Sequence, residues 1–161
     1  MKIRLATNQD KEQIQNIVFG ILSEYGLKND PNGTDSDLND IEANYIARGG
    51  TFVVVENDAS QIVGTAGLFY LRSGVCELRK MYLLKETRGK GVGKQTMEYL
   101  LAKARELGFQ RIELETASVL VEAISLYTRY GFRPIECGHL LTLRCDKAFA
   151  LDLIPSASSS N

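Results

Sequence analysis

The stretch Met81–Tyr99 reads MYLLKETRGKGVGKQTMEY, and it determines how the rest of the chain is organised. An apolar strand pattern leads into the loop Arg88–Lys94, and an amphipathic helix pattern begins directly behind that loop. Glycines on alternate positions let the backbone approach a ligand closely, and a helix start offers unpaired N–H groups to an anion. The stretch therefore predicts a pyrophosphate-binding loop, to which Arg88, Lys90 and Lys94 add positive charge.

The spacing of the glycines excludes two common phosphate-binding loops. A P-loop requires a glycine, four residues and then Gly-Lys-Ser/Thr. Here Gly93-Lys94 is followed by Gln95, and Arg88 stands five residues before Gly93. A dinucleotide-binding fingerprint that began at Gly89 would need a third glycine where the chain has Lys94. A nucleotide-binding regulator that uses the loop for ATP is therefore strongly disfavoured.

The pattern that fits is Arg-x-x-Gly-x-Gly, formed by Arg88, Gly91 and Gly93. It resembles the acyl-CoA-binding signature of the GNAT superfamily of N-acetyltransferases. A second segment, Leu126–Phe132 (LYTRYGF), is similar to the aromatic/Leu-Tyr-x-x-x-Gly-Phe segment of the same family. The resemblance covers the chain from Ile3 to about Cys145. It implies acetyl-CoA as co-substrate and transfer of the acetyl group to a primary amine.

The periodicity of the remaining chain predicts an order of strands and helices that is similar to that of the same family. A strand at residues 2–6 precedes a helix capped by Thr7, and a second helix is expected from near Asp35 to Gly49. Residues 51–84 predict three antiparallel strands, and the helix behind the loop leads to a strand at 111–115. A helix capped by Ser118 and a hairpin of residues 132–137 and 140–145 around His139 complete the pattern.

We therefore expect a mixed α/β, GNAT-like single domain over residues 1–153, with a disordered tail at 154–161. Its centre should be a mixed, mostly antiparallel sheet of about seven strands flanked by four helices.

Composition and charge limit the class of protein and its partners. The 161 residues are 44% hydrophobic and 24% charged, which suits one globular domain. A net charge of -1 gives no electrostatic reason to expect nucleic acid or an anionic membrane as partner. The sequence shows no membrane-spanning run and no signal peptide, which favours a cytoplasmic location. A monomer and a homodimer both stay open.

The cysteines Cys76, Cys137 and Cys145 do not have the spacing of a metal site, and the chain has one histidine, His139. We therefore expect no metal, and reduced, mostly buried thiols. His139 is a weak candidate for a catalytic base, because a turn residue far from the glycine loop is expected to be solvated.

The chemistry of amine acetylation suggests two catalytic residues. An amine with a pKa near ~10.4 is protonated at neutral pH, so a base must remove a proton before it attacks a thioester. The resemblance to the histone-modifying branch of the family implies Glu77, which lies 11 residues before Arg88, as that base. The alternative is a strand carboxylate paired with Arg79. The resemblance also implies Tyr127 as the acid that protonates the departing CoA thiolate, with a core tyrosine as the alternative.

Main-chain groups are expected to hold the donor. The resemblance implies that the N–H of Leu83, in the strand that also carries Met81, polarises the thioester carbonyl. The pyrophosphate is expected on the N–H groups of the loop residues Arg88, Gly89, Lys90, Gly91, Val92, Gly93 and Lys94.

The acceptor is less determined. Five acids gather before the first strand of the three-stranded segment without a basic residue among them: Asp30, Asp35, Asp37, Asp40 and Glu42. They either form a negative rim for a cationic amine or cap a helix start, and capping is favoured. We expect a small-molecule or peptide amine. A non-catalytic acyl-CoA-binding module that regulates a protein partner is the alternative, disfavoured by the presence of both Glu77 and Tyr127.

Overall fold

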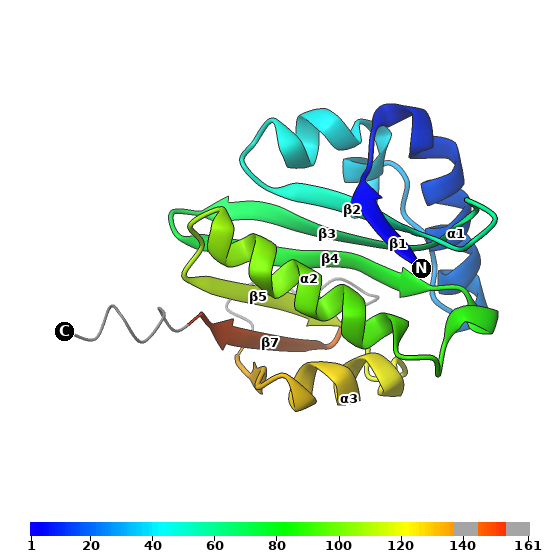
Figure 1. The fold of residues 1–161 in the computed structure, drawn as a ribbon. Coiled ribbons are helices and arrows are strands. Elements are labelled where there is room, and N and C mark those ends of the chain that lie inside the picture. The colour runs from blue at the N-terminus through cyan, green and yellow to red at the C-terminus, as the bar shows by residue number, and fades with distance from the viewer. Residues whose placement is uncertain (137–144, 154–161) are drawn as a thin grey trace.

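The computed structural model describes residues 1–136 and 145–153 and consists of one seven-stranded sheet with helices packed on its two faces (Figure 1). The strand order is β1-β2-β3-β4-β5-β7-β6, and β4–β5 is the single parallel pair among the described strands. The strands are β1 (Lys2–Leu5), β2 (Thr51–Glu56), β3 (Ile62–Arg72), β4 (Val75–Leu83), β5 (Arg111–Thr116), β6 (Arg133–Pro134) and β7 (Lys147–Asp152). The expected fold class is thereby confirmed.

Three α-helices and several shorter helical segments join these strands. The α-helices are α1 (Lys11–Glu24), α2 (Val92–Glu106) and α3 (Val121–Arg129). The short segments are η1 (Asn8–Asp10), η2 (Ser36–Asn39), η3 (Glu42–Ile46) and η4 (Lys85–Thr87). Thr7 caps η1, which runs directly into α1, so the predicted helix start is correct.

The region 35–49 is helical, but the expectation of one continuous helix there is wrong. A 3-10 turn, η2, ends at Asp40, where the backbone becomes extended, and a π-helical turn, η3, follows. The Asp40 carboxylate accepts a hydrogen bond from the N–H of Ala43 at 3.0 Å, so this side chain starts a new turn instead of continuing the old one. The two turns together form the fourth helical segment beside the sheet.

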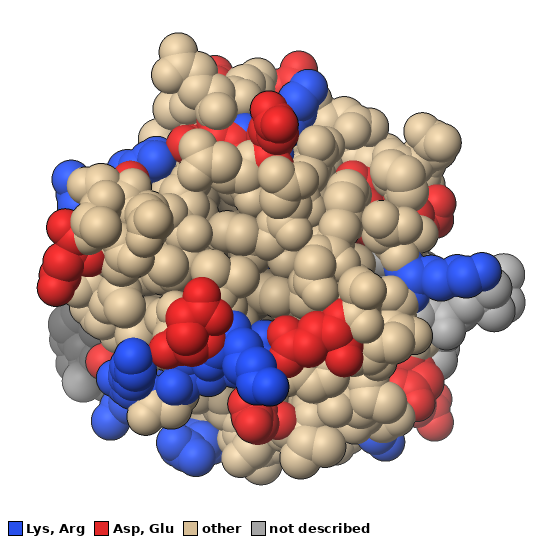
Figure 2. All heavy atoms as spheres, turned by 90° about the vertical axis from the view of Figure 1, so that its right-hand side faces the viewer, with Lys and Arg blue, Asp and Glu red and all other residues tan. Residues whose placement is uncertain are grey.

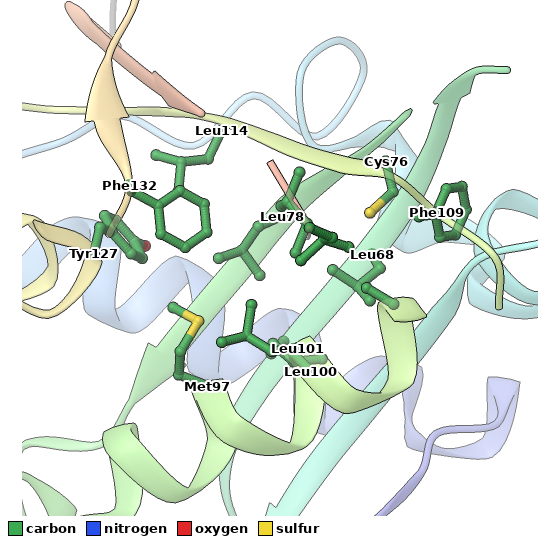
Figure 3. Packing of buried hydrophobic residues seen from close by; sticks show 14 of the residues in the cluster. Leu68, Cys76, Leu78, Met97, Leu100, Leu101, Phe109, Leu114, Tyr127 and Phe132 are labelled. Carbon is green, nitrogen blue, oxygen red and sulfur yellow. The ribbon is translucent and has the colours of Figure 1, made fainter. Parts of the chain in front are cut away.

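Alternation along β2 divides the core into two layers. Phe52 and Val54 point toward α1, whose buried residues include Ile14 and Val18. Val53 points to the opposite face, where Met97, Leu100, Leu101 and Ala104 of α2 pack against it and its neighbours. Figure 3 shows this second layer, with Tyr127 and Phe132 at one end and Cys76 and Phe109 at the other.

A bulge in β4 shapes the part of the sheet where the candidate active site lies. Lys80 adopts a left-handed conformation (φ 56°) inside the strand, and its carbonyl accepts a hydrogen bond from Thr65 Oγ1 at 2.7 Å. Gly67 of β3 lies opposite Phe52 of β2, and a Cβ on Gly67 would come within 2.7 Å of the Phe52 ring, so this close approach requires glycine. β4 pairs with β5 only from Val75 to Glu77. Beyond that point the two parallel strands separate.

The C-terminal part differs from the prediction in two places. Ser118 was expected to cap α3, but its hydroxyl and N–H both donate to Asp146, each at 2.8 Å, and Leu120 holds the cap position. The strand that pairs with β5 and β6 is β7, at Lys147–Asp152, which the sequence did not indicate. Its Lys-Ala-Phe-Ala-Leu-Asp sequence has weak strand preference because of the two alanines. The expectations for Cys137, His139 and the tail from 154 fall outside the described residues.

Candidate active site

A cavity of about 750 Å³ lies where β4 and β5 separate. β4 lines it from Glu77 to Leu83, and the end of β5 lines it from Glu115 to Ala117. The glycine loop, α3, α1 and residues from the segment 33–48 complete the wall. Figure 2 shows the side of the molecule on which β4 ends and α2 begins; basic and acidic side chains lie beside one another there. No charge of one sign covers this face.

The glycine loop forms part of the cavity wall. Gly89 (φ 76°) and Gly91 (φ 82°) both have left-handed backbone conformations, which favour glycine. Gly91 is the N-cap of α2, and no side-chain hydrogen bond caps this helix, so its first N–H groups are left for another acceptor. Gly89, Gly91, Gly93 and Lys94 line the cavity.

Two other loop residues do not face that space. Val92 is buried in a small cluster with Val55 and Val63. Lys90 is outside the set of described residues that line the cavity.

Arg88 is used differently from the expectation that it adds charge to the loop. Its guanidinium donates two hydrogen bonds to the Glu24 carboxylate of α1, at 2.6 and 2.9 Å. Its Nε donates to the carbonyl of Leu83 at 3.0 Å. Arg88 thereby lowers the pKa of the Glu24 carboxyl, mainly through these hydrogen bonds. Glu24 offsets the charge of Arg88, and the side chain joins the end of β4 to α1.

Met81 and Leu83 both line the cavity from β4, past the bulge at Lys80. Leu83 lies opposite Gly64 in β3, and a Cβ on Gly64 would come within 2.5 Å of a Leu83 methyl group. The missing side chain at Gly64 therefore allows Leu83 to pack across the sheet surface next to the glycine loop.

Tyr127 belongs to both the core and the cavity wall. Its ring is 6% exposed and packs against Phe132, with ring centroids 5.8 Å apart (Figure 3). Burial raises the pKa of the Tyr127 phenol above its ordinary value of 10.0. Within the described residues its hydroxyl makes no hydrogen bond. Tyr130, by contrast, donates to Glu98 at 2.6 Å and does not line the cavity.

Glu77 lines the same cavity, and its carboxylate accepts a hydrogen bond from Arg79 Nε. The pairing with Arg79 that the sequence allowed is therefore present. Arg79 also lies over the Phe69 ring, 3.7 Å from its centroid, and 4.0 Å from an Asp37 oxygen. Glu77 and Tyr127 consequently share one cavity, but Glu77 has a salt-bridge partner.

Asp35 and Asp37, two of the five acids before β2, match neither expectation. Asp35 and Asp37 are almost fully buried, and Lys80 Nζ lies 3.1 and 3.3 Å from their carboxylates. Tyr45 donates a hydrogen bond to Asp37. These two acids therefore form a buried ion cluster instead of a solvated rim or a helix cap, while the Asp40 carboxylate accepts a hydrogen bond from the N–H of Ala43 in η3. Their basic partner, Lys80, is distant in sequence, and no sequence pattern predicted that it pairs with these two acids.

The comparisons with known proteins agree with this geometry. A sequence profile described as the Acetyltransferase (GNAT) family matches residues 18–132. The chain belongs to the GNAT acetyltransferase family. It is also 38% identical over 139 residues to the uncharacterized N-acetyltransferase YjgM of Escherichia coli strain K12, a match that covers 83% of each chain.

Solved structures of GNAT proteins have the same fold. A GNAT-family acetyltransferase from Staphylococcus aureus Mu50 superposes with a TM-score of 0.89 at 28% identity, covering 95% of this chain and 99% of that one. The putative acetyltransferase yncA from Salmonella typhimurium, solved with its cofactor acetyl-CoA, has a TM-score of 0.74 at 24% identity, covering 98% and 96%. At the level of the family, the activity is acetyl transfer from acetyl-CoA, and this GNAT chain is an acyltransferase.

Two further observations concern the described residues only. None of their helices has both the length and the apolar character needed to cross a bilayer. No three histidine, cysteine, aspartate or glutamate side chains among them are grouped closely enough to hold a metal ion.

Proposed function

We propose that this GNAT protein transfers the acetyl group of acetyl-CoA to a primary amine, with Glu77 as general base and Tyr127 as general acid. One observation carries the proposal: the glycine loop, Glu77 and Tyr127 line a single cavity. An acetyl donor held by the loop would lie between a carboxylate and a phenol. Direct transfer between two bound substrates requires this arrangement.

The loop supplies what a pyrophosphate needs. The uncapped N-terminus of α2 offers N–H groups and a partial positive charge, and the left-handed glycines direct the preceding N–H groups to the same side. Gly93 supports this role. A Cβ there would make only ordinary contacts within the protein, at 3.6 Å or more, so the packing does not require glycine and the close approach of a ligand would. The donor contacts that we propose are those of Met81, Leu83 and the loop residues Arg88, Gly89, Lys90, Gly91, Val92, Gly93 and Lys94.

The reaction requires proton transfers at both substrates. Glu77 first takes a proton from the ammonium group, directly or through a water molecule, and the neutral nitrogen then attacks the thioester carbon and loses its second proton as the amide forms. The Leu83 N–H stabilises the negative charge on the carbonyl oxygen. The C–S bond then breaks, and Tyr127 gives its proton to the departing thiolate. Burial favours the neutral phenol, so Tyr127 holds a proton to donate throughout the neutral pH range.

The ion pair with Arg79 supports the role of Glu77 by fixing the orientation of its carboxylate. A non-catalytic acyl-CoA-binding module would share the loop but would have no need of a carboxylate and a phenol in the same cavity. Catalysis is therefore the better reading. The cytoplasmic location, the domain span 1–153 and the choice between monomer and homodimer stay predictions.

Calorimetry with acetyl-CoA, followed by an assay of thiol release over a panel of amines, tests the proposal. We expect binding of acetyl-CoA and amine-dependent release of CoA. ATP serves as the control compound, for which no binding is expected. Absence of acetyl-CoA binding would contradict the proposed activity, and binding without amine-dependent turnover would favour the regulatory module.

A further inference from the structure

The acceptor end of the cavity contains a cation that the proposed reaction does not use. Arg48 follows the π-helical turn η3 and lines the cavity together with Phe69, Glu77 and Arg79. Its guanidinium carbon lies over the Phe69 ring, 4.5 Å from the centroid. Across the described residues, Arg48 makes no ion pair and no hydrogen bond, although its side chain is exposed and has five N–H donors.

Phe69 places this guanidinium near the proposed base. In the β3–β4 ladder Phe69 lies directly opposite Glu77, and paired residues project from the same face of a sheet. The Tyr45 ring packs against Phe69 in an edge-to-face arrangement, with centroids 5.6 Å apart, so Phe69 is held in place. Arg48 therefore stacks on Phe69, the residue that pairs with Glu77 on the neighbouring strand.

The two guanidinium groups on Phe69 differ in their partners. Arg79 is paired with Glu77 and lies 4.0 Å from Asp37, so its charge is offset. Arg48 has no such partner in the described part of the chain. Stacking on an aromatic ring holds a guanidinium in one plane while its N–H groups stay available to a planar anion.

The pairing of the other charged groups at this end of the cavity also favours an anion at Arg48. Lys80 is neutralised by the buried carboxylates of Asp35 and Asp37, and Arg79 by Glu77. Among the described basic side chains at this end of the cavity, Arg48 is the one that has no carboxylate partner, so its guanidinium can pair with an anionic group of a bound molecule. A polyamine would place positive charge beside it, which is unfavourable. A molecule with an amine at Glu77 and a carboxylate at Arg48 would match both groups.

We propose that the acceptor is a small molecule of the amino-acid class, and that Arg48 binds its carboxylate while its amine lies at Glu77. The proposal rests on the proposed acetyltransferase function and names its substrate class. Because Phe69 and Glu77 are opposite one another, amine and carboxylate are expected only a few bonds apart, as in a free α-amino acid. Arg48 is a specificity residue and takes no part in the proton transfers.

The test compares amino acids with their own amides. Each pair has the same side chain and amine and differs in the carboxylate, and acetyl-CoA-dependent thiol release is measured for both. The native chain should use the acids with a kcat/KM at least about ten-fold higher, since a charged hydrogen-bonded pair contributes that much or more. Arg48→Met should lower kcat/KM for the acids to the level of the amides, mainly through KM, and leave the amides unchanged.

Arg105→Met is the matched control, because Arg105 is an exposed arginine in the last turn of α2 and does not line the cavity. It should keep the preference for acids. Equal use of acids and amides by the native chain, or an equal loss on both in Arg48→Met, would overturn the assignment of Arg48 while acetyl transfer itself stands. Absence of acetyl-CoA binding would instead remove the proposed function and this inference with it.

Discussion

Lys80 Nζ lies 3.1 Å from a carboxylate oxygen of Asp35, and neither side chain has appreciable contact with solvent. Lys80 sits on the bulge of β4, while Asp35 begins the segment that carries the acceptor end of the cavity. Asp37 adds a second carboxylate 3.3 Å from the same ammonium group. The ion cluster thus fastens the segment before β2 to the strand that holds Glu77.

Removal of the cation should therefore unfold or loosen the acceptor segment. In Lys80→Met two carboxylates remain buried without their partner, and we expect a loss of about 3–5 kcal/mol in the free energy of unfolding. Urea unfolding measures it. Lys103→Met is the control: its partner Glu106 is mostly exposed, so the change should stay within about 0.5 kcal/mol. A similar loss in the free energy of unfolding for both variants would show that the buried cluster stabilises the fold no more than an exposed ion pair does.

Glu77→Gln should slow acetyl transfer by about 10²–10⁴-fold at neutral pH, because the amide cannot accept the proton of the amine. The readout that separates a base from a structural carboxylate is pH. As pH rises toward the pKa of the acceptor amine, more of the acceptor is already neutral, and the deficit of the variant should shrink. A deficit that stays constant with pH would indicate that Glu77 acts only by holding Arg79.

Tyr127→Phe should reduce kcat while leaving the fold intact. Among the described residues the hydroxyl makes no hydrogen bond, so its removal leaves no partner unsatisfied. A loss of about 10²-fold or more in kcat with an unchanged unfolding transition is expected. Tyr130→Phe is the matched control, since it removes a phenol that bonds Glu98 away from the cavity. Equal kinetics of both variants and the native chain would reject Tyr127 as the acid.

Gly93→Ala separates a requirement of the ligand from a requirement of the fold. The new Cβ would lie 3.6 and 3.7 Å from Leu126 and Leu83, which is ordinary contact, and alanine favours a helix by up to about 1 kcal/mol. Stability should hold or rise, while acetyl-CoA binds about ten-fold or more weakly. Gly20→Ala in α1, where a Cβ meets nothing within 4 Å, should raise stability without affecting binding. Undiminished acetyl-CoA affinity in Gly93→Ala would argue against close approach at this glycine.

Cys76 makes the stability of the protein sensitive to alkaline pH. Burial raises the pKa of its thiol from 9.0 to about 12. The unfolded thiol therefore ionises first, so this contribution is complete below pH 9 and is lost as pH rises toward 12. Between pH 8 and pH 10, Cys76→Ala should lose less free energy of unfolding than the native chain. The same slope in both proteins would contradict the burial effect.

The sequence predicted those parts of the fold in which local pattern and tertiary role coincide. The periodicity of α1 and α2, the apolar run of β2 and the turn before β4 each have a strong local signal, and the structure has elements there. The glycine loop was equally readable, because its left-handed positions and its helix start are properties of a few adjacent residues. The prediction of a donor site at that loop followed from the same features.

Other features depend on residues that are distant in the chain. The partner of Asp35 is Lys80, and no periodicity predicts a left-handed lysine in the middle of a strand. β7 is a strand because β5 offers it an open edge, although its alanines give little strand signal. The ring that Arg48 stacks on comes from β3, so a role for Arg48 required the folded chain.

The hydrogen-bonded ion pair between Arg88 and Glu24 has a consequence for how the binding of the two substrates is coupled. One end of it belongs to the glycine loop and the other to α1, and Ile21 of α1 and the following residue Tyr25 line the cavity. If a donor binds at this loop and shifts it, the Arg88–Glu24 contact is expected to couple that shift to α1. Thermodynamic reciprocity then requires that a bound acceptor alter donor affinity by the same factor as a bound donor alters acceptor affinity. The two half-sites are expected to act as one cooperative unit, with Glu24 as the residue that sets their coupling.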